Sequence, residues 1–145
     1  FMLKTSLGYP EEEDEFNLLT QRKQGDPLET LQEVMTMDEL KEHKETLQNL
    51  PIHEDILKYL LHLIRSTRTE PRIQLGASPR TSLGLMKFSQ ALSYLRGKDH
   101  VGIDEIQTAW IPVLSHRIFL FPGERSTQSP EDVLSDIIQA TPVPR

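Results

Sequence analysis

Three helix-start signals punctuate this chain, and they constrain its fold more than any other feature. Ser78-Pro79 and Ser129-Pro130 each place a capping serine before a proline, the residue favoured at the first helical position. Thr36 and Glu39 have the spacing of a capping box, in which each side chain bonds the other residue's backbone amide. These signals predict helices over residues 79–95, 130–139 and 37–49.

Apolar residues at three- and four-residue spacing extend the helical pattern. Residues 54–68 are predicted to form a central helix whose buried face carries Leu57, Leu60, Leu61 and Ile64, broadened by Ile56 and Leu63. The helix over 79–95 is predicted to bury Leu85, Phe88, Leu92 and Leu95. Further helices are expected over 11–23, which begins with an acidic first turn, and over 104–114, with a loop at 69–77.

One strand-like run stands at the start of the chain, Phe1 to Leu7. A single strand has no partner here, so it is either a frayed terminus or the last strand of a sheet that lies upstream. Phe1 precedes Met2, so we expect a piece or processed product of a longer protein. The fold class predicted is an all-α helical bundle with a short N-terminal strand left over from an α/β core.

The composition of the 145 residues excludes several function classes. A net charge of -6 argues against nucleic acid as the main partner, because neutralising phosphates needs clustered Lys and Arg. There is no cysteine, and the five histidines show no metal-ligand spacing, so no metal site is predicted. No signal peptide or membrane-spanning run is visible, which makes a cytoplasmic location the expectation and membrane insertion unexpected.

The segment Gly76-Ala77-Ser78-Pro79-Arg80 is the most informative local motif. A helix N-terminus carries partial positive charge and unpaired amides, so Arg80 at the second helical position is unfavourable for stability, by ~0.3–1 kcal/mol. Exposed amides together with a guanidinium suit a phosphate oxygen. The alternative is that Arg80 pairs with a nearby acid such as Glu70.

Other candidate motifs have simpler interpretations. Val101 to Glu105 superficially looks like the strand and acidic pair that hold magnesium in ATPases, but its spacing indicates the first turn of a helix. No phosphate-binding loop of the form G-x-x-x-x-G-K-[ST] occurs. Three arginines gather near one helix end, where they complement the helix dipole: Arg65, Arg68 and Arg72.

Several of these segments resemble the lid domain of MoxR ATPases, a branch of the AAA+ superfamily. The similar segments are Gly76 to Leu83 (GASPRTSL), Ala91-Leu92, Arg96 to Val101 (RGKDHV) and Val113 to Arg117 (VLSHR). The opening residues, through Gly8-Tyr9-Pro10, resemble the final core strand and the hinge of that family, and residues 11–19 its next helix. The resemblance implies that residues 1–10 are the end of the ATPase core and hinge, and that residues 11–145 are the helical lid domain.

The resemblance also implies roles for particular residues. Arg80 matches the sensor-2 arginine, which reaches from the lid to the nucleotide phosphates, with Pro79 beside it. Tyr9 and Pro10 would lie near the adenine. ATP and Mg²⁺ would be held mainly by the core, whose phosphate loop, magnesium-binding acids and arginine finger would all precede Phe1. The parent protein would be an ATP hydrolase, and this chain alone would not.

The family further implies a ring, usually of six subunits, and chaperone-like remodelling of partner proteins, often ones with von Willebrand factor A domains. Two departures concern helix capping only: Gly102-Ile103 replaces the family's Thr/Ser-Pro start, and His53 occupies an N-cap position better suited to Ser or Asp.

A second hypothesis is a non-enzymatic helical interaction module that binds a partner helix in a groove, with Arg80 incidental and residues 1–7 a tail. A third, a helix-turn-helix DNA-binding protein, is disfavoured by the acidic charge.

Overall fold

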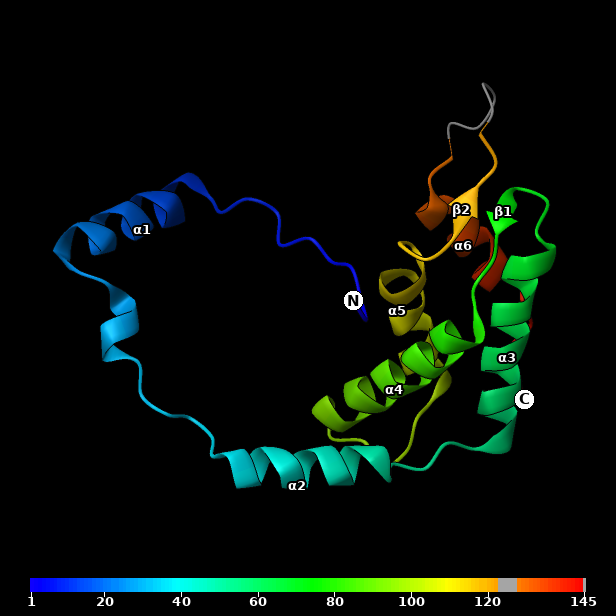
Figure 1. Cartoon of the computed structure of the whole chain (residues 1–145), viewed down its shortest axis with the longest axis horizontal. Helices are drawn as coiled ribbons and strands as arrows, with labels where there is room; N and C mark the ends of the chain where they lie inside the picture. The colour runs from blue at the N-terminus through cyan, green and yellow to red at the C-terminus, as the bar shows by residue number, and fades with distance from the viewer. Residues whose placement is uncertain (123–127, 145) are drawn as a thin grey trace. The chain divides into compact units, whose positions relative to one another are not determined.

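The computed structural model describes residues 1–122 and 128–144, and over these ranges the chain is predominantly helical (Figure 1). In chain order the elements are α1 (Glu12–Gln24), the short 3-10 helix η1 (Pro27–Thr30), α2 (Met37–Gln48), α3 (Glu54–Thr69), β1 (Ile73–Leu75), α4 (Pro79–Leu95), α5 (Ile103–Leu114), β2 (Phe119–Leu120) and α6 (Pro130–Ala140). The all-α prediction is confirmed. The two predicted Ser-Pro starts begin α4 and α6.

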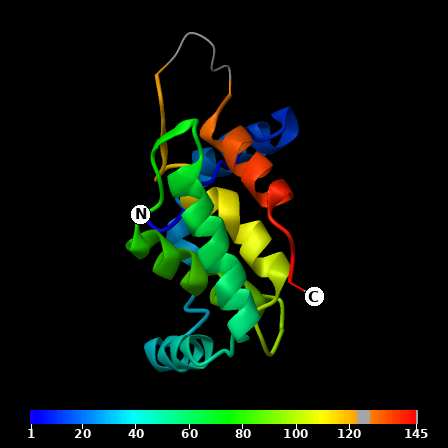
Figure 2. The same ribbon diagram turned by 90° about the vertical axis from the view of Figure 1, so that its right-hand side faces the viewer.

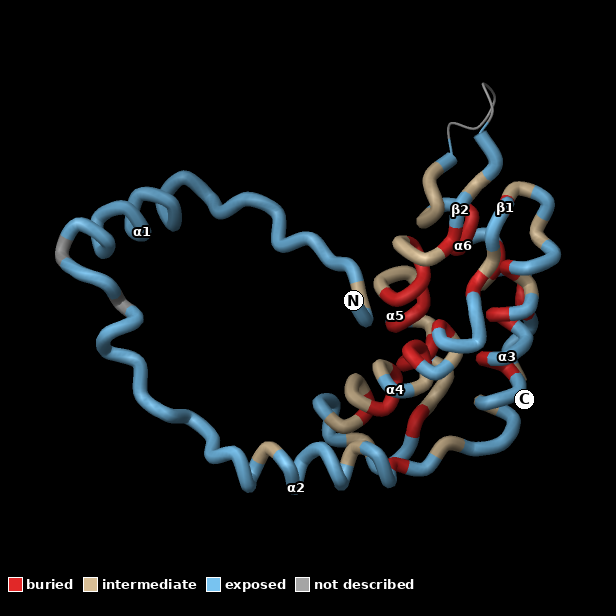
Figure 3. Tube along the Cα trace, in the orientation of Figure 1, coloured by how far each residue is buried: buried red, intermediate tan, exposed pale blue. Residues whose placement is uncertain are grey.

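The described residues fall into two compact units, residues 5–44 and residues 1–4 with 45–145. In the first of these, α1 has acidic residues in its first turn and basic residues in its last, as predicted for a solvated helix. Figure 3 shows α1 exposed along its length. Before α2, the Glu39 amide donates to the Thr36 hydroxyl (3.2 Å) and the Thr36 amide to the Glu39 carboxylate (2.7 Å), the predicted capping box.

The opening segment is extended but does not form the strand expected over residues 1–7. Strand structure requires a ladder of partners, whereas the described residues offer this segment one backbone bond, from the Lys4 amide to the Pro112 carbonyl (2.8 Å). A small antiparallel sheet forms elsewhere: Ile73 of β1 lies opposite Leu120 of β2, and Leu75 opposite Phe119. Two- and three-residue strands are too short to show alternation, so the sequence predicts only a loop at 69–77.

The second unit is a bundle of α3, α4, α5 and α6 (Figure 1 and Figure 2). α3 packs against α4, α6 and β1. Its buried residues are Tyr59, Leu60, Leu63, Ile64 and Thr67. The expected positions of Leu57 and Leu61 on this face are wrong, since their side chains are 38% and 49% exposed. The apolar face of α3 is wider than one stripe of residues, and the positions of the neighbouring helices decide which part of it is buried.

At the start of α3, His53 Nδ1 accepts a hydrogen bond from the Asp55 amide (3.3 Å), so the histidine serves as the N-cap.

α4 buries small and polar side chains instead of the complete leucine stripe predicted for it. Leu85 is fully buried, but Leu95 at the last turn is 80% exposed. Gly84, Ser89 and Ser93 are buried along the helix, which packs closely on α5. The Ser89 hydroxyl is satisfied within its own helix by donating to the Leu85 carbonyl (2.9 Å). Small residues allow the two helix backbones to approach closely. The spacing of apolar residues alone does not predict that small and polar residues are the buried ones.

α5 contributes the centre of the hydrophobic core, which Figure 3 shows as the buried interior of the bundle. Its fully buried apolar residues are Ile106, Ala109, Trp110, Val113 and Leu114. The Trp110 indole N–H donates to the Leu134 carbonyl of α6 (2.9 Å), so the largest core side chain has its polar atom satisfied. α5 ends at Leu114, as predicted, and Pro112 lies inside its last turn.

A buried carboxylate joins the end of α4 to the start of α5. Glu105 is 0% exposed, and its carboxylate accepts from Arg96 Nη1 (2.7 Å) and Lys98 Nζ (2.8 Å). Its other oxygen accepts the Gly102 amide (3.1 Å), so Glu105 supplies the cap that Gly102 lacks. Burial acts to raise the pKa of Glu105, but the hydrogen bonds from Lys98, Arg96 and Gly102 outweigh it and lower that pKa from 4.5 to about 2.

This pKa predicts acid sensitivity. A carboxylate whose pKa is lower in the folded chain stabilises the fold fully above pH 4.5, and that contribution is lost as pH falls from 4.5 to about 2. Because Arg96 and Lys98 are partly exposed, we expect a loss of at most about 3 kcal/mol in the free energy of unfolding. Urea unfolding across this pH range measures it.

The matched variants are Glu105→Gln and Glu54→Gln. Glu105→Gln should be less stable at neutral pH and should have a flatter pH profile below pH 4.5, because the titrating group is gone. Glu54→Gln removes an exposed carboxylate of α3 and should leave the profile of the wild-type chain. Equal acid sensitivity of Glu105→Gln and the wild type would show that this carboxylate does not cause it.

Candidate functional site

The loop between β1 and α4 lies directly on the last turn of α3. A Cβ atom at Gly76 would be 2.6 Å from the Thr67 carbonyl oxygen and 2.9 Å from the Arg68 Cα, so only glycine fits this approach. The Ala77 amide donates to the Thr67 hydroxyl (3.0 Å), and Arg68 Nε donates to the Ala77 carbonyl (2.9 Å). α3 therefore determines where α4 begins. Arg68 does more than the dipole role predicted for it.

The N-terminus of α4 has no side-chain cap, whereas the predicted N-termini of α2 and α6 are both capped. Ser78 is the N-cap residue, but its hydroxyl lies against the Thr81 hydroxyl (3.2 Å) and makes no cap hydrogen bond to the helix amides. α4 has no acidic residue in its first turn. In α6, by contrast, Ser129 and Asp132 satisfy each other's amides. The start of α4 thus keeps its partial positive charge uncompensated.

Arg80 adds a full positive charge to this open end. Its side chain is exposed, and it forms no ion pair with any described residue. The alternative pairing with Glu70 is wrong: Glu70 binds Arg72 Nε at 2.6 Å, and Arg72 also binds Asp136 at 2.6 Å. The hydrogen bond from Arg72 lowers the pKa of Glu70. The nearby acid is therefore committed to the β1–α6 contact, which leaves Arg80 available.

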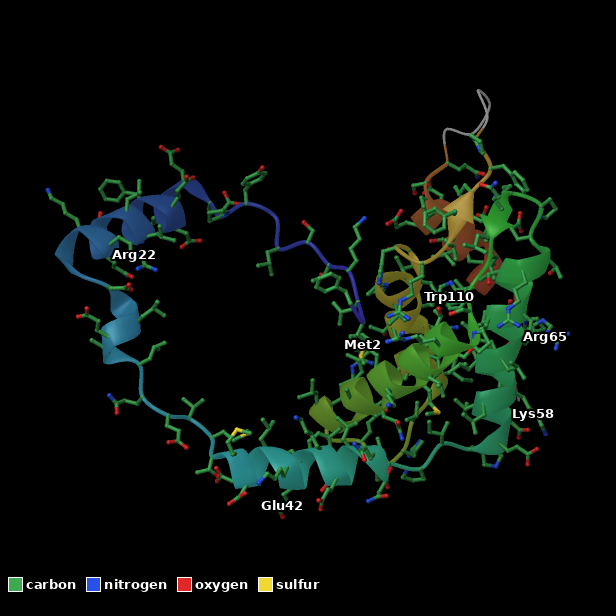
Figure 4. All side chains as sticks on the ribbon, in the orientation of Figure 1. Met2, Arg22, Glu42, Lys58, Arg65 and Trp110 are labelled. Carbon is green, nitrogen blue, oxygen red and sulfur yellow. The ribbon has the colours of Figure 1, made fainter. Side chains whose placement is uncertain are left out.

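Arg80 opens onto a pocket of about 890 Å³ within the bundle unit. Its lining residues are Phe1, Met2, Leu75, Gly76, Ser78, Arg80, Thr81, Leu83, Gly84, Lys87 and Arg117. Three of these are cations, and no acidic side chain lines the pocket among the described residues. Figure 4 labels Met2, which marks the side of the pocket formed by the opening segment. Three uncompensated cations beside an open helix N-terminus favour a polyanionic ligand.

Sequence reasoning identified only part of this pocket. Pro79 and Arg80 lie at the start of α4, as predicted. Lys87 was not singled out, although it follows Arg80 by two helical turns and that spacing could have indicated a shared face. Arg117 comes from beyond α5, and no spacing rule connects it to Arg80. Tyr9 and Pro10 belong to the other unit, where Tyr9 is fully exposed.

The helical bundle corresponds to a known class of domain. The AAA lid domain family matches residues 65–137, slightly more than half of the chain, and this range contains α4, α5 and the three cations of the pocket, Arg80, Lys87 and Arg117. The chain belongs to the AAA lid domain family, in the MoxR-type branch of the AAA+ ATPases.

Two curated relatives match almost the whole of this chain. Uncharacterized protein YeaC of Bacillus subtilis is 32% identical over 145 residues, which covers 99% of this chain and 45% of that protein. Chaperone MoxR1 of Mycobacterium tuberculosis is 25% identical over 155 residues, covering all of this chain and 41% of that protein. This chain therefore spans less than half the length of these curated relatives.

The fold has a counterpart among solved structures. A crystal structure of a candidate ATPase from Cytophaga hutchinsonii superposes with a TM-score of 0.89 at 21% sequence identity, over 100% of this chain and 47% of that one. At this identity the likeness establishes the fold. No helix among the described residues is long and apolar enough to cross a membrane.

Proposed function

We propose that this domain is the nucleotide-sensing lid of a longer MoxR-type ATPase, and that Arg80 contacts the γ-phosphate of ATP. The observation that carries the proposal is the unpaired guanidinium of Arg80 at an uncapped helix start, next to a pocket lined by further cations. This arrangement costs stability in the absence of an anion, since like charges repel and the helix dipole disfavours a cation there. An ATP phosphate would relieve both effects.

The residues of this chain fit a nucleotide polyphosphate but not its magnesium ion. Arg80, Lys87 and Arg117 supply positive charge, and the start of α4 at Pro79 supplies oriented backbone dipoles. Within residues 1–122 and 128–144 no three His, Asp or Glu side chains converge as a metal site needs. We therefore propose that Mg²⁺ and the phosphate loop are provided by an ATPase core elsewhere in the longer protein. When bound, Mg²⁺ would neutralise charge on the phosphates.

The remaining parts of the proposal rest on the family. Tyr9 and Pro10 would border the adenine, and the hinge at residues 8–10 would pass the nucleotide state to neighbouring subunits of a ring, which we propose to be a hexamer. Nucleotide cycling in that ring would drive chaperone-like remodelling of partner proteins, including proteins with von Willebrand factor A domains. The chaperone name of the mycobacterial relative supports this direction.

The test is Arg80→Ala in the full-length protein that contains this chain. Loss of one positioned charge at a developing anion typically lowers turnover by about 10²- to 10³-fold, and we expect a decrease in kcat of that size. The melting temperature should be unchanged or slightly higher, because a cation leaves a helix N-terminus. Steady-state ATP hydrolysis with thermal unfolding of the same samples measures both.

Arg65→Ala is the matched control. Arg65 is an exposed arginine of α3 that does not line the pocket, so its removal should leave turnover and stability within experimental scatter. Normal hydrolysis by Arg80→Ala would contradict the sensor role and would make the position of Arg80 incidental to ATP turnover.

A further inference from the structure

A second arginine of the pocket, Arg117, is committed to the backbone of the opening segment. Its Nη2 donates to the carbonyls of Phe1 (2.7 Å) and Met2 (3.1 Å). Two residues further on, the Lys4 amide donates to the Pro112 carbonyl (2.8 Å), in the last turn of α5. Residues 1–4 are thus held to the bundle by three hydrogen bonds that all reach the end of α5 and the turn after it.

The other nitrogens of the Arg117 guanidinium are also placed. Its Nε donates to His116 Nε2 (3.3 Å), which orients the plane of the group. Its Nη1 lies over Gly84 of α4, where an added Cβ would be only 3.2 Å away. Glycine inside a helix is unfavourable by roughly 1 kcal/mol relative to alanine, so this glycine needs a packing reason, and room for the guanidinium is that reason.

These contacts place one side chain between two functional parts of the domain. On one side, Arg117 touches the helix that begins with Pro79 and Arg80. On the other, it holds the segment that continues along the chain to Gly8, Tyr9 and Pro10. Because Nη2 already bonds two carbonyls and Nε a histidine, Arg117 has less donor capacity for phosphate than Arg80.

We propose that Arg117 is a positioning residue, which clamps residues 1–4 to α4 so that a change at Arg80 on nucleotide binding is transmitted to the segment leading to the hinge. The response to nucleotide rests on the proposed function. The clamp that Arg117 forms with residues 1–4 can be tested independently of that function. Arg117 does not touch the phosphate in this mechanism. Removing it separates the segment from α4 while Arg80 still binds.

The experiment uses the full-length protein with Arg117→Met, Gly84→Ala and the control Arg65→Met. Amide hydrogen exchange of Lys4 reports the clamp, since this amide is bonded only while residues 1–4 are seated. Its protection should fall about ten-fold in Arg117→Met, the size expected for loss of about one hydrogen bond's stabilisation. In the wild type a non-hydrolysable ATP analogue should change Lys4 protection, and in Arg117→Met it should not.

Kinetics distinguish positioning from binding. We expect Arg117→Met to lower kcat about ten-fold with KM for ATP within about two-fold, because binding is kept while coupling is lost. Gly84→Ala displaces the guanidinium without removing its charge, so it should weaken Lys4 protection in the same direction although the helix itself becomes more stable. Arg65→Met should change none of these quantities.

Three results would overturn the proposal. Unchanged Lys4 protection in Arg117→Met would show that no clamp exists, whatever Arg80→Ala does. A rise in KM with Lys4 protection intact would make Arg117 a phosphate ligand instead. Loss of Lys4 protection with normal kcat would leave a packing contact without transmission. Failure of the sensor role alone is recognised separately, by normal turnover in Arg80→Ala.

Discussion

Trp110→Ala is expected to lower the free energy of unfolding by about 3–5 kcal/mol, a large part of the stability of a domain this size. Trp110 is 0% exposed on α5, the helix that packs against both α4 and α6. Truncation removes the buried apolar area, leaves a cavity that the surrounding helices only partly close, and deprives the Leu134 carbonyl of its hydrogen bond (2.9 Å). Figure 4 labels the side chain in the bundle interior.

Urea unfolding followed by circular dichroism measures the effect, with Trp110→Phe as the matched control. Phenylalanine keeps an aromatic ring in the core but cannot donate to Leu134, so it should lose about 1–3 kcal/mol, less than alanine. Equal losses for the two variants would mean that the hydrogen bond, and not the ring's volume, carries the stability. A loss below about 1 kcal/mol for alanine would contradict the packing described for α5.

Gly76→Ala should destabilise the domain by about 3 kcal/mol and displace the start of α4. The new methyl group would lie 2.6 Å from the Thr67 carbonyl oxygen, and both are attached to backbone, so neither can turn aside. Relief requires the loop to move off α3, which breaks the hydrogen bond from the Ala77 amide to Thr67 and the one from Arg68 Nε to the Ala77 carbonyl. Arg80 moves with the loop, so ATP turnover of the full-length protein should fall as well.

Gly84→Ala is the control for this substitution, because the same methyl group meets a different neighbour. It would lie 3.2 Å from Arg117 Nη1, the end of a flexible side chain, and the helix gains an alanine. We expect Gly84→Ala to keep or raise the melting temperature, while Gly76→Ala lowers it. Similar melting temperatures for the two variants would show that the approach of the loop to α3 is looser than 2.6 Å.

Much of the helical framework could be predicted because its signals are local. A capping box, a Ser-Pro pair or an acidic first turn involves residues within four positions of one another, so it can be recognised in the sequence without knowledge of the fold. The starts of α2, α4 and α6 follow these signals. For residues 101–105 the helical spacing favours the first turn of a helix and not a magnesium-binding strand. The structure agrees, since Asp104 and Glu105 lie in the first turn of α5.

The details that could not be predicted depend on neighbours distant in the sequence. Leu57 and Leu95 satisfy the helical spacing yet are exposed, since packing partners choose which part of an apolar arc is covered. Glu105 appeared only as an acidic first-turn residue, and its burial against Arg96 and Lys98 emerges when α4 and α5 come together. Among the residues that the structure describes, the extended opening segment has no ladder partner, so its strand-like composition does not produce a strand.

The sequence by itself determined that this domain is helical and that Arg80 lies in the first turn of α4, because both follow from short-range backbone chemistry. The structure alone showed that Ser78 makes no cap hydrogen bond there. The tertiary structure alone decided that Lys87 and Arg117 join Arg80 around one pocket, and that Arg117 ties the opening segment to α4. A pocket is formed by residues that folding brings together. Arg80 and Arg117 are far apart in the sequence, so their order along the chain does not predict that they line the same pocket.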